Sequence, residues 1–160
     1  MSEKYNIAVV GATGAVGREI INILEERKFP IENLYLLASS RSQGQKINFQ
    51  DQEIVVGDLS EFDFSLVNIG LFSPGGSVSA EFAPKAASAG CIVIDNTSHF
   101  RMQDNIPLLV PEVNAKVLED FFENKNRSNI IANPNCSTIQ MVVALKPLHD
   151  AAIINRIVVS

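Results

Sequence analysis

Residues 6–17 read Asn-Ile-Ala-Val-Val-Gly-Ala-Thr-Gly-Ala-Val-Gly. The first five form a nearly continuous apolar run ending at Gly11, which predicts a short strand buried on both faces. Beyond Gly14 the apolar residues take the spacing of one face of an amphipathic helix, at Val16, Ile20, Ile23 and Leu24. A buried strand, a glycine-rich turn and a helix in direct succession are typical of the opening unit of a parallel sheet covered by helices.

Strand and helix patterns alternate along most of the remaining chain. Apolar runs predict further strands at 34–38, 47–56, 67–72, 91–95 and 129–132. The second of these is one or two short strands around a turn near Asp51. Helices are predicted at 80–89, with Pro84 in or kinking the first turn and Gly90 just past the end, at 115–124, and at 137–145 before Pro147. This alternation predicts a Rossmann-like, doubly wound, mainly parallel sheet with helices on both faces.

The composition is that of a globular domain with a core of its own. The chain has 160 residues, of which 46% are hydrophobic and 19% charged. Its formal charge of −5 argues against nucleic acid as a partner, because nucleic-acid binding concentrates Lys and Arg on one face. Two cysteines and two histidines, without Cys pairs, predict neither a disulfide framework nor a metal site.

The sequence carries no signal for a membrane or for secretion. No apolar run approaches the roughly 18 residues of a membrane span, and residues 1–5 lack the layout of a signal peptide. We therefore expect a cytoplasmic protein without a membrane partner. The run at 153–159 has a strand-like pattern with nothing after it to cover its face, so we expect a fragment of a longer protein, or one completed by another chain.

The turn between the first strand and the first helix is a candidate phosphate site. Its glycines, Gly11, Gly14 and Gly17, are spaced G-x-x-G-x-x-G rather than the usual G-x-G-x-x-G. The physical requirement is the same, because glycines let the backbone approach a pyrophosphate and the N–H groups of the helix start face the anion. Residues 13–16 are expected to supply most of the contacts. The alternative is a glycine turn needed only for close packing of strand and helix.

The segment after the second strand favours NADP over NAD. Many NAD enzymes place an acidic residue there, which binds the ribose 2′-hydroxyl. This chain instead has Ser39, Ser40, Arg41 and Ser42. A carboxylate would repel a 2′-phosphate, whereas a guanidinium and hydroxyls can receive it. The alternative is a solvated polar loop with an incidental arginine.

Cys136 is the candidate nucleophile. It follows Asn135 at the predicted start of a helix, where the helix dipole and free N–H groups favour a thiolate. Asn135 is suited to orienting a carbonyl or supporting an oxyanion beside the sulfur. A buried structural cysteine fits the local pattern equally well. Cys91 begins an apolar strand and is therefore expected to be such a structural residue.

Six blocks of sequence carry a family resemblance. They are Gly11-Ala12-Thr13-Gly14-Ala15-Val16-Gly17, Ala38-Ser39-Ser40-Arg41-Ser42, Ser73-Pro74-Gly75-Gly76, Asp95-Asn96-Thr97-Ser98-His99-Phe100-Arg101-Met102, Val110-Pro111-Glu112-Val113-Asn114 and Asn133-Pro134-Asn135-Cys136-Ser137-Thr138. In this order and across almost the whole chain, they resemble the aspartate-semialdehyde dehydrogenase family. Acetylglutamyl-phosphate reductases share the glycine turn but look different around the cysteine, and they rank second.

The resemblance implies a reaction and a set of site residues. Cys136 would attack the carbonyl of L-aspartyl 4-phosphate, phosphate would leave, and hydride from NADPH would release L-aspartate 4-semialdehyde, in the biosynthesis of lysine, threonine, methionine and diaminopimelate. Arg101 would bind the substrate phosphate, and Asn135 would lie beside the acyl group. Asn96 would lie near the nicotinamide or that phosphate. The implied cofactor contacts are Arg41 and Ser42 at the 2′-phosphate and Ser73, Gly75 and Gly76 along the cofactor groove.

The resemblance also implies what this chain lacks. The family's acid–base histidine, a carboxylate-binding arginine and a substrate-binding glutamine lie in a second domain, and the chain ends just before the place of that glutamine. We therefore expect an NADP-binding Rossmann-like domain at 1–135 and the start of a catalytic and dimerisation domain at 136–160. The chain alone is expected to bind NADP but to be almost inactive, whereas the full-length protein would be a homodimer or homotetramer.

Two other functions compete with this interpretation. A non-catalytic NADP-binding module, for sensing or interaction, would keep the cofactor site but have an inert Cys136. A short-chain-type reductase needs a Tyr followed four residues later by a Lys. Tyr5 is followed at that distance by Val9 and Tyr35 by Ser39, which excludes this class.

Overall fold

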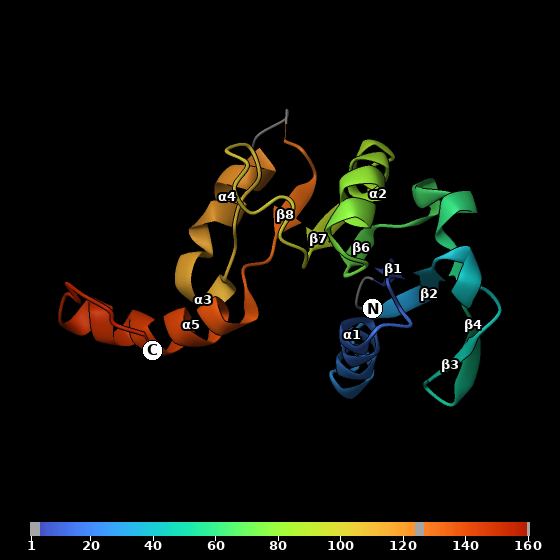
Figure 1. Cartoon of the computed structure of the whole chain (residues 1–160), viewed down its shortest axis with the longest axis horizontal. Helices are drawn as coiled ribbons and strands as arrows, with labels where there is room; N and C mark the ends of the chain where they lie inside the picture. Colours follow the sequence, from blue (N-terminus) through green and yellow to red (C-terminus); the bar gives the residue numbers. More distant parts are fainter. Residues whose placement is uncertain (1–3, 124–126, 160) are drawn as a thin grey trace.

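The computed structural model of the chain describes residues 4–123 and 127–159. Its centre is a six-stranded parallel sheet with the strand order β5-β2-β1-β6-β7-β8 (Figure 1). The strands are β1 (Tyr5–Val10), β2 (Ile31–Ala38), β5 (Gly57–Asp58), β6 (Ile69–Phe72), β7 (Ile92–Asp95) and β8 (Ile130–Ala132). Strand order reverses between β1 and β6, as in doubly wound Rossmann-like sheets, so the predicted fold class is confirmed.

The sheet is accompanied by helices and one hairpin. The helices of the described ranges are α1 (Ala15–Glu26), α2 (Gly76–Ser88), α3 (Pro111–Asn114), α4 (Lys116–Glu123) and α5 (Cys136–Ala151). The helix predicted at 115–124 is α4, and residue 124 lies outside the described residues. The hairpin of β3 (Lys46–Phe49) and β4 (Gln52–Val55) turns at Gln50 and Asp51, whose φ angles of 48° and 62° suit a tight hairpin turn. None of the helices described is long and apolar enough to cross a membrane.

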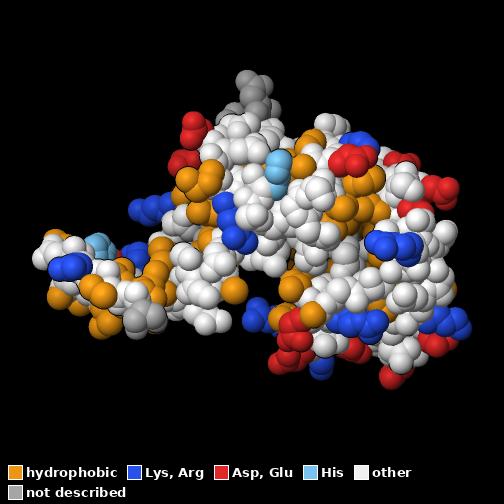
Figure 2. Space-filling model, viewed as in Figure 1, with side chains coloured by type: hydrophobic (Ala, Val, Ile, Leu, Met, Phe, Trp, Pro, Cys, Tyr) orange, Lys and Arg blue, Asp and Glu red, His pale blue; other side chains and the backbone are white. Residues whose placement is uncertain are grey.

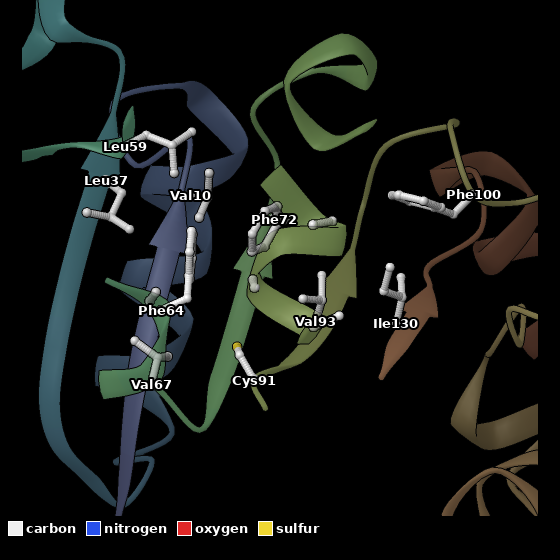
Figure 3. Packing of buried hydrophobic residues seen from close by; sticks show 14 of the residues in the cluster. Val10, Leu37, Leu59, Phe64, Val67, Phe72, Cys91, Val93, Phe100 and Ile130 are labelled. Atoms are coloured by element: carbon white, nitrogen blue, oxygen red, sulfur yellow. The ribbon is translucent and has the colours of Figure 1, made fainter. Parts of the chain in front are cut away.

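Strand β1 is buried on both faces, as its apolar run predicts. Successive side chains of a strand point to opposite faces, and Ala8 and Val10 accordingly belong to one hydrophobic cluster while Ile7 and Val9 belong to another. Figure 3 shows the first cluster, with side chains contributed by neighbouring strands from Leu37 on β2 to Ile130 on β8. Buried alanines of α2 close this face, and α1 with the hairpin closes part of the other.

Helix α1 buries only part of the predicted face: Leu24 is buried and Ile20 is partly buried against the second cluster, but Val16 and Ile23 are exposed. Its buried residues are Gly17, Ile21 and Leu24, whereas Val16 is 48% exposed and Ile23 is 38% exposed. Gly17 packs against the glycine turn, which fixes the side of α1 that faces the sheet. Val16 is one residue earlier and is therefore turned by about 100° around the helix. Spacing alone could not distinguish these faces, because apolar residues lie on both.

Two helices extend further than their prolines predicted. Helix α2 begins at Gly76 rather than at residue 80, so Pro84 lies in its interior, and α5 continues through Pro147 to Ala151. Each proline removes one helical N–H···O=C bond, yet the turns on both sides remain helical. Gly90, with φ of 95°, follows the end of α2, as predicted for a glycine that terminates a helix.

The C-terminal segment is not a strand. Residues 152–159 form neither helix nor strand, and their large apolar side chains are 51–78% exposed at Ile153, Ile157, Val158 and Val159. In Figure 2 such side chains are visible along α5 and this segment, at the left of the view. The strand predicted at 153–159 is therefore wrong for this chain, since no strand of the described ranges pairs with it and an unpaired strand is not stable alone.

Candidate functional site

The glycine turn holds β1, α1 and β6 in close contact. Gly11 has a φ of 85°, and a Cβ there would lie 2.8 Å from the carbonyl carbon and oxygen of Ser73. A Cβ at Gly17 would lie 2.8 Å from the Gly11 carbonyl carbon and closer still to its oxygen. Gly11 is therefore required for both its conformation and its space, and Gly17 for its space. Gly17 is therefore needed for close packing of strand and helix, which was the alternative to a phosphate site. The same turn also borders a cleft, at Gly11 and Gly14.

That cleft has a volume of about 480 Å³ and lies at the carboxyl ends of the central strands. This is the place where doubly wound sheets bind nucleotides, beside the reversal of strand order. Seven of the predicted cofactor residues line it: Gly11, Thr13, Gly14, Ser39, Ser40, Arg41 and Ser73. The structure thus brings together three segments that are far apart in the sequence.

The other predicted cofactor residues lie around this cleft without lining it. They are Ala15, Val16, Gly17, Ser42, Gly75 and Gly76. Ala15 opens α1, and Gly75 is the N-cap of α2. Both helices therefore begin near the cleft, with the unpaired N–H groups of a helix start available there. Val16 lines a neighbouring groove instead.

The sequence analysis missed seven lining residues: Ala38, Asp58, Leu59, Ser60, Pro74, Val78 and Phe82. Asp58 ends β5 and is paired in register with Ala38, the last residue of β2. Its carboxylate accepts hydrogen bonds from the Ser60 hydroxyl at 2.7 Å and the Ser60 N–H at 2.8 Å, which lower the pKa of Asp58. A strand of two residues has no periodicity, so no pattern in the sequence could have placed Asp58 here.

Arg41 is exposed at the rim of the cleft. It lies in the short 3₁₀ helix Ser40–Ser42, directly after β2. Within the described residues its guanidinium makes no hydrogen bond or ion pair. An exposed guanidinium without an ion pair to a described residue is suited to an anionic group of a bound nucleotide.

A second polar cluster joins the ends of β7 and β8. Arg101 donates through Nε to the carbonyl of Asn133 at 3.0 Å and through Nη2 to the carbonyl of Asn96 at 3.1 Å. Asn133 Nδ2 donates to Asn96 Oδ1 at 2.7 Å. The half-buried guanidinium is thereby held between two loops, and its Nη1 makes no bond to a described residue. These bonds leave Arg101 an outward donor of the kind that binds phosphate.

Cys136 is exposed and is the first residue of the long helix α5. Asn135 is the N-cap of that helix, and its Oδ1 accepts from the N–H groups of Ser137 at 3.0 Å and Thr138 at 3.4 Å. The acceptor of Asn135 is thus used in capping, and only its amide N–H groups can reach an acyl oxygen. Within the described residues Cys136 is thus not part of the hydrophobic core.

Cys91 has the opposite environment. Its side chain is fully buried in the cluster of Figure 3, and this burial raises the pKa of the thiol to about 12. A thiol with such a pKa is not a nucleophile near neutral pH. The prediction that Cys91 is structural is confirmed.

A groove of about 320 Å³ lies between the first turns of α1 and the polar cluster of Asn96 and Asn133. It is lined by Val16 and Ile20 of α1, by Asn96 after β7 and by Asn133 after β8, among others. Gly14 borders the cleft and Val16 borders this groove, so the first turn of α1 touches both. No group of three or more His, Cys, Asp or Glu within 4–123 and 127–159 is placed to hold a metal ion.

Comparison with known proteins gives consistent results. Residues 6–121 match the family described as "Semialdehyde dehydrogenase, NAD binding domain". The aspartate-semialdehyde dehydrogenase of Legionella pneumophila is 59% identical over 157 residues, which are 98% of this chain and 44% of that protein.

Solved structures agree. Aspartate semialdehyde dehydrogenase II of Vibrio cholerae, complexed with ASA, has a TM-score of 0.88 and 54% identity, covering 93% of this chain and 47% of that one. Aspartate semialdehyde dehydrogenase of Candida albicans, with NADP, has a TM-score of 0.78 and 27% identity, covering 95% of this chain and 48% of that one. The chain spans about half the length of the relatives that it matches.

Proposed function

Because the chain belongs to the semialdehyde dehydrogenase family and matches its NAD-binding domain, we propose that it is the cofactor-binding part of an NADP-dependent aspartate-semialdehyde dehydrogenase. The reaction is the reductive dephosphorylation of L-aspartyl 4-phosphate to L-aspartate 4-semialdehyde. The observation that carries the proposal is the placement of Cys136. It is exposed at the start of α5, three residues after Asn133, to which Arg101 is bonded.

The cleft fits a dinucleotide with a 2′-phosphate. Backbone lines it at Gly11 and Gly14, where no side chain stands between the turn and a ligand. Arg41 at the rim is suited to the 2′-phosphate, and the apolar side chains of Leu59 and Phe82 offer a surface for a flat base. When bound, NADPH supplies the hydride for the reduction.

The chain's own residues carry out the attack on the acyl carbon and bind the leaving phosphate. The Cys136 sulfur forms a bond to the acyl carbon, the bond from that carbon to the phosphate oxygen breaks, and phosphate leaves with the electron pair. Arg101 binds the phosphate, and an Asn135 N–H donates to the acyl oxygen. After reduction the carbon–sulfur bond breaks, the aldehyde is released and Cys136 is again a thiolate.

The proposal extends to the whole protein through the family resemblance. The domain boundary lies at 135/136, where α5 begins, and the acid–base histidine is supplied by a further domain. The full-length protein works in the cytoplasm as a homodimer or homotetramer. The isolated 160-residue chain binds NADP and is almost inactive.

The test is phosphate-dependent reduction of NADP by the full-length protein with L-aspartate 4-semialdehyde. We expect activity in the wild type and in C91A, and its loss in C136S, because only Cys136 reaches the acyl carbon. Activity of C136S comparable to the wild type would contradict the proposal. A wild type that binds NADPH without turnover would identify a non-catalytic NADP-binding module. Turnover only of an N-acetylglutamyl substrate would identify an acetylglutamyl-phosphate reductase.

A further inference from the structure

Asp95 is a buried carboxylate that forms no ion pair with a residue of the described ranges. It is the last residue of β7 and its side chain is completely buried. Carboxylates are seldom fully buried without a charged partner. The bonds to Asp95 come from two hydroxyls: that of Ser79 donates to Oδ1, and that of Thr97 donates to Oδ2 at 2.7 Å. The proposed chemistry gives Asp95 no role.

The first of these hydroxyls belongs to the cofactor side of the molecule. Ser79 lies in the first turn of α2, is itself completely buried, and donates its N–H to the carbonyl of Gly75 at 3.0 Å. Its neighbour Val78 and the preceding Ser73 and Pro74 line the cleft. The bond between Ser79 and Asp95 therefore fixes the start of α2 against the end of β7, as their adjacent positions in Figure 1 allow.

The second hydroxyl belongs to the loop that carries Arg101. Thr97 is 8% exposed, and its Oγ1 accepts from the N–H of His99 at 3.3 Å while donating to Asp95. This pair of bonds sets the turn between the end of β7 and Arg101. The Asp95 carbonyl also accepts from the N–H of Asn133 at 2.8 Å, on the segment that leads to Cys136.

We propose that Asp95 is a positioning residue that holds the cofactor loop at α2 and the phosphate-binding loop at Arg101 in one fixed arrangement. Its Oδ1 accepts from Ser79 at the start of α2, and its Oδ2 accepts from Thr97 in the loop before Arg101. A carboxyl group suits this task because each of its two oxygens can accept a hydrogen bond. An apolar residue of similar size would fill the space but hold neither loop. The inference rests on the proposed function, because it assigns substrate phosphate to Arg101 and the cofactor to the cleft.

The test removes the Thr97–Asp95 bond and the Ser79–Asp95 bond separately, in the full-length protein. T97V keeps the shape of Thr97 but removes its hydroxyl, and S79A removes the other. We expect T97V to raise the KM for phosphate about tenfold and to leave the Kd of NADPH within about twofold, since the hydrogen bond from Thr97 to Asp95 is lost. We expect the reverse for S79A. The control T97S retains the hydroxyl and should restore the wild-type KM.

A merely structural role predicts something else. T97V and S79A would then lower Tm and the yield of active protein without moving either constant, and that result would overturn the proposal. An equal rise of both constants in T97V would overturn it as well. The degree to which phosphate protects Cys136 from alkylation provides a second measure of phosphate binding at Arg101, and this measure does not depend on turnover. A wild type without phosphate-dependent turnover refutes the proposed function instead, so the two failures are distinguishable.

Discussion

Replacement of Gly17 by alanine tests whether the close contact between α1 and the glycine turn requires a residue without a Cβ. A Cβ at this position would lie 2.8 Å from the Gly11 carbonyl carbon and 2.9 Å from the Ala12 Cα. To reach ordinary contact at 3.4 Å it must withdraw by 0.6 Å from the Gly11 carbonyl carbon and by more from the Gly11 carbonyl oxygen, which lies closer still. Both atoms are backbone, so no rotamer change relieves the overlap, and we expect a cost at the upper end of overpacking, about 3 kcal/mol.

For a chain of this size that free energy lowers Tm by about 6–12 °C. The assay is thermal and urea denaturation followed by far-ultraviolet circular dichroism, because the chain has no Trp for fluorescence. G17A should also weaken NADPH binding, because the displaced turn lines the cleft.

Gly76 provides the matched control. It is also a helical glycine, at the start of α2, but a Cβ there would have nothing within 4 Å. The same substitution should leave stability unchanged or raise it by up to about 1 kcal/mol, since alanine favours the helix. A G17A protein within about 0.5 kcal/mol of the wild type, the usual range of substitutions that meet no packing penalty, would refute the steric reasoning, as would a G76A protein that is equally destabilised.

Four further outcomes are expected. R41A should weaken NADPH binding by about 10- to 100-fold and NADH binding little, measured by titration calorimetry, because only NADPH carries the 2′-phosphate; equal losses would mean that Arg41 does not contact that group. Alkylation at pH 8 should label Cys136 alone in the native chain and Cys91 as well after unfolding, as read by mass spectrometry. Burial raises the pKa of Cys91 in the folded state to about 12, above the ordinary thiol pKa of 9.0, so the folded state retains a proton that the unfolded state loses. Stability should therefore fall as pH rises from 9 towards 12, by at most about 1.4 kcal/mol per pH unit, and C91A should abolish this slope in urea titrations. Finally, S60A should return the lowered pKa of Asp58 towards 3.8, measured by carboxyl NMR, because both bonds that lower it involve Ser60 and one is the lost hydroxyl; an unchanged pKa would contradict that cause.

Local patterns in the sequence were sufficient for most of the strands and for the position of the glycine turn, but not for the two-residue strand β5 or for residues 153–159. The run at 6–10 became β1, and the turn near Asp51 became the hairpin turn. These features depend on residues within a few positions of one another, through alternating burial and tolerance of positive φ. The same locality explains why Cys136 could be placed at a helix start from its own neighbourhood.

Prolines and helix faces were less predictable from the sequence. Pro84 and Pro147 each suggested a boundary that the helices pass through. Proline disfavours a helix interior by about 3 kcal/mol, and in α2 the turns on both sides of Pro84 are held by the buried residues Ala83, Ala86 and Ala87. Local propensity is therefore a weak guide wherever long-range contacts compete with it.

By itself, the sequence determined a parallel α/β sheet, a glycine turn between the first strand and the first helix, and a Cys136 placed at the start of a helix. Only the tertiary structure decided which face of α1 is buried, that Asp58 joins the cleft, and that Asp95 bonds to both Ser79 and Thr97. The physical reason is that burial and side-chain bonds of this kind arise between segments separated along the chain. The spacing of apolar residues shows which face a segment can bury. The residues that it packs against depend on the order of the strands in the sheet.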